Sequence, residues 1–316
     1  MKIINFIDKL PTTNQDFDII ICTLSPESRA INIAHKYKIS SSKKLAIICD
    51  SRKELAYTEN DDFFELNGFE KIHPHDFFES IKNFTSSHPL NTIRIALDIS
   101  CMPRQFMAEV VLHILNLQDF VKFEITFCYS LANFTPPLTA VVPNEAIEPV
   151  HSSFSGWPSK QSLPTSLITG LGYEPEKAEG ASEYLDPSEQ WGFIPISPVE
   201  EFLPELEKNN SSLIMRLSGE NRVIKYEIDQ PSRTFGQLEI VISDLLTRSN
   251  PILLPFGPKI FFVLCLIQSF RHPEIGVWHV TGETHEAPVD RCASGVEIGF
   301  QVTFAKKNLS IEENIY

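Results

Sequence analysis

Short apolar segments rich in β-branched residues alternate with helical patterns along the first 135 residues. The segments are IIICTL (19–24), LAIICD (45–50), IRIALDIS (93–100) and VKFEITFCYS (121–130). RAINIAHKY (29–37) follows the first after a short turn, and QFMAEVVLHILNL (105–117) follows the third, both with helical periodicity. Continuous buried strands that alternate with helices are typical of a parallel sheet covered on both faces. We therefore expect residues 1–135 to form a Rossmann-like α/β domain.

A second set of the same elements follows a proline-rich stretch. Residues 136–164 contain six prolines and show no helical periodicity, which is typical of a connection between domains. Residues 166–185 and 251–270 each have the pattern of strand, turn and helix, and residues 274–280 have that of a further strand. The sequence thus predicts an α/β protein of two tandem Rossmann-like domains with mainly parallel sheets, the second spanning residues 165–316.

The two halves also resemble each other at their turns, which indicates an internal duplication. Glu27, Arg29 and Ala30 after the first strand match Glu174, Lys177 and Ala178 in the second half. Pro103-Arg104 and Pro258-Lys259 each stand between a later strand and its helix. The separation from Glu27 to Arg104 is similar to that from Glu174 to Lys259. We therefore expect two equivalent sites that have diverged.

Composition excludes several classes of function. Gly68 is the one glycine among residues 1–150, and the other twelve follow it, so the first half has no glycine-rich phosphate loop. The formal net charge is −14 and neither half has a surplus of Lys and Arg, which argues against general binding of duplex nucleic acid. The six cysteines show no C-x-x-C pair, and no apolar run approaches the length of a membrane span. These features predict a cytoplasmic protein with no membrane partner.

The turns after the first and fourth strands are the expected ligand site, because in a doubly wound sheet these turns meet at the carboxyl edge. A helix that begins beside Arg104 or Lys259 offers backbone N–H groups and a fixed positive charge, which suit a phosphate. Glycines in the second half allow a close approach of backbone to ligand. The candidate ligand-binding residues are Thr23, Ser25, Glu27, Arg29, Asp98, Ser100, Arg104, Gly170, Gly172, Glu174, Lys177, Gly257 and Lys259.

Structural roles explain some of these residues equally well. Asp98 and Ser100 are suited to capping the following helix, and Glu27 to complementing a helix dipole. If the protein is an enzyme, Glu27, Asp98 and Glu174 are the candidate general acids or bases. No Cys or His spacing of a recognised zinc site occurs, either at His73-Pro74-His75-Asp76 or in residues 279–286, so we expect no metal and no cofactor.

The turn Thr23-Leu24-Ser25-Pro26-Glu27 and the turn from Asp98 to Arg104 (DISCMPR) together resemble those of the CRISPR-associated Rossmann fold (CARF) family. The resemblance covers only these two loops, and Cys101, Met102 and Pro103 stand where that family has glycines. It implies a sensor that holds a cyclic oligonucleotide or related nucleotide between two such folds, in antiviral defence or a stress response, and that acts on a protein effector.

Three functions are therefore expected: binding of a nucleotide or other phosphorylated compound between the lobes, an enzyme that cleaves or transfers at a phosphate or glycosidic bond, or a non-catalytic interaction protein that uses the proline-rich connection.

Overall fold

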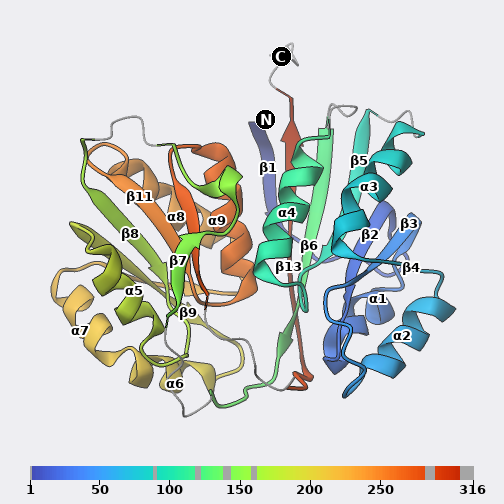
Figure 1. The fold of residues 1–316 in the computed structure, drawn as a ribbon, viewed down its shortest axis with the longest axis horizontal. Helices are drawn as coiled ribbons and strands as arrows, with labels where there is room; N and C mark the ends of the chain where they lie inside the picture. Colours follow the sequence, from blue (N-terminus) through green and yellow to red (C-terminus); the bar gives the residue numbers. More distant parts are fainter. Residues whose placement is uncertain are drawn as a thin grey trace, which may run out of the picture.

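Two mainly parallel β-sheets with helices on their faces form two lobes that lie side by side (Figure 1). The computed structural model describes residues 2–87, 91–117, 122–137, 144–157, 162–281 and 289–306. The α/β class and the two Rossmann-like sheets expected from the sequence are confirmed. In the part of the chain described, no helix is long and apolar enough to span a bilayer.

The first lobe contains a seven-stranded sheet. In spatial order its strands are β1 (Lys2–Asp8), β13 (Ala293–Ala305), β6 (Lys122–Ala132), β5 (Thr92–Asp98), β2 (Asp16–Leu24), β3 (Ser40–Ile48) and β4 (Glu70–Ile72). Its helices are η1 (Ser28–Ile31), α1 (Asn32–Tyr37), α2 (Tyr57–Leu66), η2 (Pro74–Asp76), α3 (Phe77–Ser86) and α4 (Arg104–Leu115). β13 runs antiparallel to both of its neighbours, and the other strands of this sheet are parallel to one another.

The second lobe contains a six-stranded sheet. In spatial order its strands are β10 (Val223–Glu227), β9 (Glu189–Ile196), β8 (Thr165–Gly170), β11 (Asn250–Pro255), β12 (Gly276–Thr281) and β7 (Ala146–Pro149). Its helices are η3 (Ser152–Phe154), α5 (Lys177–Leu185), α6 (Phe202–Asn209), α7 (Ser211–Gly219), α8 (Pro231–Leu245) and α9 (Lys259–Arg271). Only β7 is antiparallel to its neighbour.

Both sheets follow the same strand order. Within each lobe the five parallel strands, numbered along the chain, lie in the order 3-2-1-4-5: β4-β3-β2-β5-β6 in the first lobe and β10-β9-β8-β11-β12 in the second. The order reverses between β2 and β5 and between β8 and β11, and this reversal is where open α/β sheets bind ligands. The shared order agrees with the internal repeat expected from the turn sequences.

The lobes exchange their sixth strands. After β6 the chain leaves the first sheet and adds β7 beside β12, and after β12 it returns and adds β13 beside β6. Figure 1 shows the red C-terminal strand among the strands of the first lobe. The sheets therefore do not follow the boundaries expected from the sequence, because β7 lies inside the expected connection (136–164) and β13 inside the expected second domain (165–316). A strand's pattern tells which of its faces is buried, but it does not tell which sheet edge the strand joins.

One apolar core joins the two lobes. Every residue from Ile260 to Ser269 of α9 is buried, because this helix packs on β11 and β12 and also on α8 and on α4 of the other lobe. Such enclosure explains why its sequence is apolar on all sides. At the edge of the first sheet, Phe6 stacks between Phe300 (4.9 Å between ring centroids) and Phe235 of α8 (4.7 Å). The lobes are thereby fixed with the carboxyl ends of both sheets at a shared boundary.

Candidate functional site

Arg104 and Lys259, the paired bases of the repeat, each reach into the opposite lobe. Arg104 Nη2 donates to the carbonyl oxygens of Phe256 (2.9 Å) and Gly257 (2.6 Å), and Lys259 Nζ donates to that of Ser100 (2.8 Å). The preceding prolines have nearly the same extended backbone, with φ −61° and ψ 144° at residue 103 and φ −56° and ψ 146° at residue 258. The two turns are thus equivalent in geometry, and their bases hold the lobes together reciprocally.

Burial disfavours the charged form of both bases. Burial lowers the pKa of Arg104 below its ordinary value. Its Nε is buried and has no hydrogen-bond partner among the described residues. Burial also lowers the pKa of Lys259 to about 8, and the nearby positive charge of Arg29 acts in the same direction. A bound anion would relieve both effects, since a negative charge close by favours the charged form of a base.

A polar cleft of about 890 Å³ lies at the carboxyl edge of the first sheet. The turns after β2, β3 and β5 form one wall, and β12 with the turns after β8 and β11 forms the other. Its lining includes the predicted residues Thr23, Ser25, Glu27, Arg104, Glu174 and Lys177, together with Asp50, Arg52, Cys101 and Arg291. The sequence therefore located this cleft, although it did not indicate the contribution of β12.

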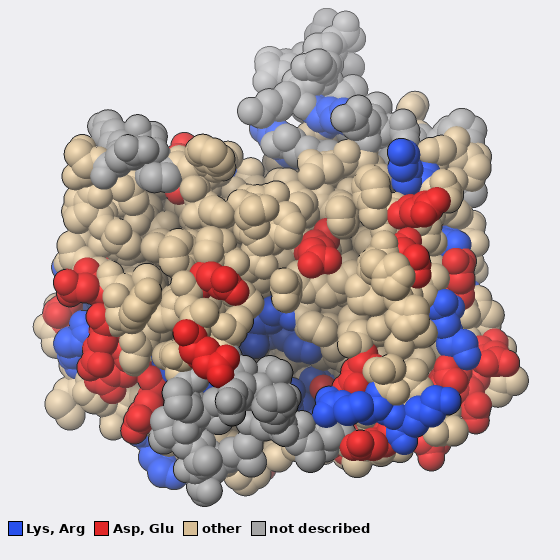
Figure 2. Space-filling model, viewed as in Figure 1, with Lys and Arg blue, Asp and Glu red and all other residues tan. Residues whose placement is uncertain are grey.

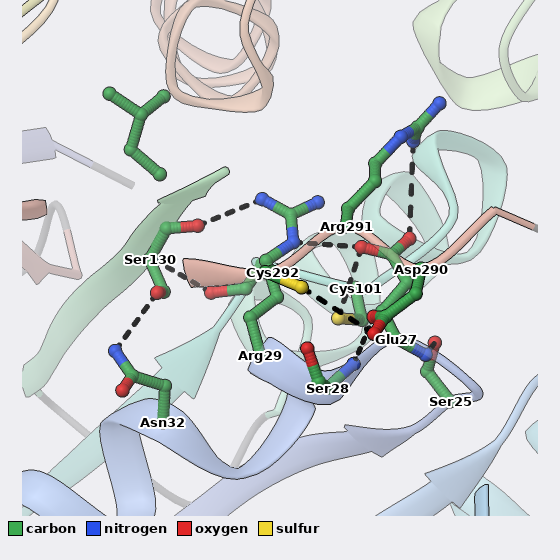
Figure 3. A network of polar contacts seen from close by, with 12 residues as sticks. Ser25, Glu27, Ser28, Arg29, Asn32, Cys101, Ser130, Asp290, Arg291 and Cys292 are labelled. Atoms are coloured by element: carbon green, nitrogen blue, oxygen red, sulfur yellow. Dashed lines mark hydrogen bonds and ion pairs between the residues drawn. The ribbon is translucent and has the colours of Figure 1, made fainter. Parts of the chain in front are cut away.

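Glu27 occupies the N-cap position of η1, but its side chain makes no capping hydrogen bond and is held by cations instead (Figure 3). Its Oε2 accepts a hydrogen bond from Nε of the buried Arg29 at 2.7 Å, and its Oε1 lies 3.9 Å from Nη1 of the half-exposed Arg291. Arg29 Nη1 also donates to the backbone oxygen of Ser130 at 2.8 Å, so it is fixed from two sides. The segment that returns to the first sheet is anchored at the same place, because Asp290 accepts the backbone N–H of Ser28 at 2.7 Å.

Asp98 and Ser100 lie beneath the cleft and do not line it. Asp98 Oδ1 accepts from the backbone N–H and the hydroxyl of Ser100, and the Ser100 hydroxyl oxygen accepts the backbone N–H of Ser130 at 2.8 Å. These contacts give the two residues a structural role in the turn, but neither caps α4 as the sequence suggested, because the N-cap of that helix is Pro103 and it has no side-chain capping hydrogen bond. Burial raises the pKa of Asp98 to about 6, and its Oδ2 and Thr23 Oγ1 have no partner among the described residues.

An aromatic pocket of about 180 Å³ lies at the carboxyl edge of the second sheet. Its aromatic lining consists of Tyr129, Tyr173, Phe202 and Phe256. The Tyr173 and Phe202 ring centroids are 5.4 Å apart, and Phe134 packs against both rings from the segment after β6. Arg29, Lys259 and Gly172 also line this pocket. Arg104, Glu174, Phe256 and Arg291 line the cleft and the pocket alike, so the two spaces adjoin.

The polar cleft and the aromatic pocket are equivalent under the internal repeat. Each takes strand ends from one sheet and the end of the fifth strand from the other lobe, β12 for the cleft and β6 for the pocket. Their volumes and linings differ strongly. The two lobes thus carry a large polar space and a small aromatic one at corresponding positions. That these are two unequal ligand sites stays a prediction.

The glycines serve mainly to bring the turns and the helix together. A Cβ on Gly170 would lie 2.4 Å from Cε1 of Phe261, and one on Gly257 would lie 2.7 Å from the backbone oxygen of Leu171. Gly170 lines neither space, whereas Gly172 and Gly257 line the aromatic pocket. The expected close approach to a ligand thus applies at most to the latter two.

Among the described residues, six cations line the two spaces, against three carboxylates. The cations are Arg29, Arg52, Arg104, Lys177, Lys259 and Arg291, and the carboxylates are Glu27, Asp50 and Glu174. The chain as a whole carries a formal charge of −14, so this excess of positive charge is local. Figure 2 shows it as a hollow lined by Lys and Arg between the lobes.

Sequence reasoning missed the residues that other segments bring to the site. Arg291 arrives with the segment that leads into β13, Phe202 with α6, and Tyr129 with the end of β6. No local motif marks them. The similarity of the halves was the one available signal. It predicts equivalent positions for the fifth strands of the two lobes, β6 and β12, and so could have indicated Tyr129.

Histidines of the described residues form no metal cluster with Cys, Asp or Glu. Residues 282–286 of the second histidine segment, like Pro143 and Pro158 of the connection, lie outside the described residues. The chain matches no protein-family model and no curated protein.

Proposed function

We propose that this protein binds a nucleotide or other phosphorylated compound in the polar cleft between its lobes. The observation that carries the proposal is the convergence of six cations on one joined space in a chain of net charge −14. Phosphates bound in proteins are held by such side chains together with backbone donors. The position also fits, since ligands of doubly wound sheets bind where the strand order reverses.

The resemblance of the first-lobe turns to CARF domains supports a narrower form of the proposal, in which the compound is a cyclic oligonucleotide signal. In this form the protein is a sensor in antiviral defence or a stress response and passes its state to a protein effector. The shared strand order of the lobes supports it further, because two equivalent folds would then enclose one ligand.

Cleft residues that do not hold the lobes together provide the cleanest test. Arg291 is 47% exposed, and its one described ion pair, to Glu27, is long, so Arg291→Gln should leave the fold intact. The matched control is Arg233→Gln, which removes the same charge from an exposed position on α8. We would titrate each protein with AMP, ATP, cyclic di-AMP, cyclic tri-AMP and inorganic phosphate by isothermal calorimetry.

We expect at least one phosphorylated probe to bind the wild type and the Arg233→Gln control equally, and to bind Arg291→Gln about ten-fold or more weakly, as the loss of a charged contact implies. Absence of binding by every probe to the folded wild type would refute the proposal. Recovery of the bound probe unchanged separates binding from the enzymatic alternative, for which Glu174 is the candidate carboxylate that lines both spaces.

A further inference from the structure

The aromatic pocket has a chemistry that the polar cleft lacks. Its rings come from four separate segments of the chain: the end of β6, the turn after β8, the start of α6 and the turn after β11. Leu171, Leu206 and Ile228 add apolar side chains to the rings, beside the cations described above. At about 180 Å³ the pocket is smaller than the ~300–1,000 Å³ of ordinary small-molecule sites, whereas the adjoining cleft falls within that range. The pocket therefore suits one planar ring.

Polar groups at the pocket favour a ring that can form hydrogen bonds. Ser197 Oγ accepts the backbone N–H of Val199 at 3.1 Å, which leaves its hydroxyl proton to donate elsewhere. Arg104 also lines the pocket with its cationic side chain, and the Glu174 carboxylate there is an acceptor. An aromatic lining with a few placed polar groups is the usual setting for a nucleobase or a similar heterocycle.

Cations line both spaces, and the adjoining cleft differs in having fewer aromatic side chains: Phe256, which it shares with the pocket, and Trp278. Arg52, Lys177 and Arg291 line the cleft, and the last of these also reaches the pocket. A molecule that spans both spaces would place its charge in the cleft and its ring in the pocket. In the reverse orientation the ring would lose its contact with Tyr129, Tyr173 and Phe202, which line the pocket and not the cleft.

We propose that the ligand is a compound with a planar heterocycle and a phosphate, held in one orientation, with the ring in the aromatic pocket and the phosphate in the polar cleft. This inference rests on the proposed function, because it assumes a phosphorylated ligand. It goes beyond that function in making the small pocket the determinant of specificity, and in making the two equivalent spaces of the repeat serve different parts of a single molecule.

Removal of one ring tests the proposal. Phe202 is half-buried and packs mainly on Tyr173 and Phe134, so Phe202→Ala empties part of the pocket without touching a cation. Phe202→Trp adds volume at the same place and should close the pocket. The probes are AMP, GMP, CMP and UMP, which carry a base, and ribose 5-phosphate, which has the same phosphate without one. Circular dichroism and thermal denaturation would establish that both variants are folded.

We expect the wild type to bind at least one of the four nucleotides more tightly than ribose 5-phosphate. Stacking of a base on an aromatic side chain contributes about 1–3 kcal/mol, which corresponds to a factor of about 5–150 in affinity. Phe202→Ala and Phe202→Trp should both remove most of this preference and leave the affinity for ribose 5-phosphate unchanged.

The outcomes separate the two proposals. If ribose 5-phosphate binds the wild type as tightly as every nucleotide, or if both variants retain the preference, the assignment of the pocket is wrong while phosphate binding in the cleft stands. If neither these five probes nor those of the calorimetric screen bind the folded wild type, the proposed function itself fails.

Discussion

Replacement of Lys259 by Met tests whether its ammonium group is enclosed between the lobes. Burial lowers the pKa of Lys259 from 10.5 to about 8 in the folded protein. In the unfolded chain the pKa returns to its ordinary value, so at pH values between these two the unfolded state binds more protons than the folded state. The free energy of unfolding therefore rises with pH through this interval, and the gain is lost again as the pH falls through about 8.

The size of the effect follows from the two pKa values. A tenfold change in an ionisation constant corresponds to about 1.4 kcal/mol, so the full difference is about 3 kcal/mol, of which about 2 kcal/mol is present by about pH 9.5. We would measure urea unfolding of the wild type and of Lys259→Met at pH 7 and at pH 9.5. The stability of the wild type relative to the variant should increase by about 2 kcal/mol between these conditions.

A second variant controls for other groups that titrate at high pH. Lys259→Arg keeps its charge at both pH values, so its stability relative to Lys259→Met should not change. If the wild type shows the same constant difference as the Arg variant, Lys259 has an ordinary pKa. The described enclosure of its ammonium beside Arg104 and the Ser100 carbonyl would then be wrong.

Three further predictions concern the fold beneath the site. Gly170→Ala should lower the free energy of unfolding by about 1–3 kcal/mol, because its Cβ would overlap the buried ring of Phe261. Gly236→Ala, on an open face of α8, should instead be neutral or stabilising, and an equal loss in both variants by urea unfolding would contradict this reasoning. Burial raises the pKa of Asp98 from 3.8 to about 6, so its contribution to stability is present at low pH and lost as the pH rises through 6. Asp98→Asn should therefore gain about 2 kcal/mol relative to the wild type between about pH 4.5 and about pH 7.5 in the same assay, and a constant difference would argue against burial of the charge. Finally, a chain that ends at residue 292 lacks β13 and should lose hydrogen-exchange protection in β6 of the first lobe, while a chain that ends at residue 306 should keep it. Loss of protection confined to the second lobe would contradict the strand exchange.

Local patterns were sufficient to predict the parallel strands that carry the site. β2 and β5 are mostly apolar segments that end in polar turns, and β8 has a shorter apolar centre at Leu167 and Ile168. A helical pattern follows each of them. The correspondence between Arg104 and Lys259 was also predictable, since Pro-Arg and Pro-Lys stand at the same point of each half. These features depend on residues close together in the chain, which is why the sequence alone reveals them.

The roles of individual side chains depended on contacts that the sequence does not encode locally. Arg104 and Lys259 were expected to face a phosphate directly, yet each first donates to backbone carbonyls of the opposite lobe. Asp98 and Ser100 were expected at the ligand, yet both are buried in the turn beneath it. Whether a polar side chain at a strand end faces the cleft or the turn depends on the neighbouring strand, and here Ser130 of β6 decides it.

The sequence by itself determined the class of the fold, the repeat of its turns and the sheet edge at which the candidate site lies. The tertiary structure decided which lobe each sixth strand joins. It thereby also decided that Arg291, Phe134 and β12 lie at the candidate site. The physical reason is that hydrophobic periodicity specifies how a segment is buried against its own sheet. The partner of an edge strand, and the cavity that remains where two lobes meet, are set by the packing of segments more than a hundred residues apart, such as β6 and β13.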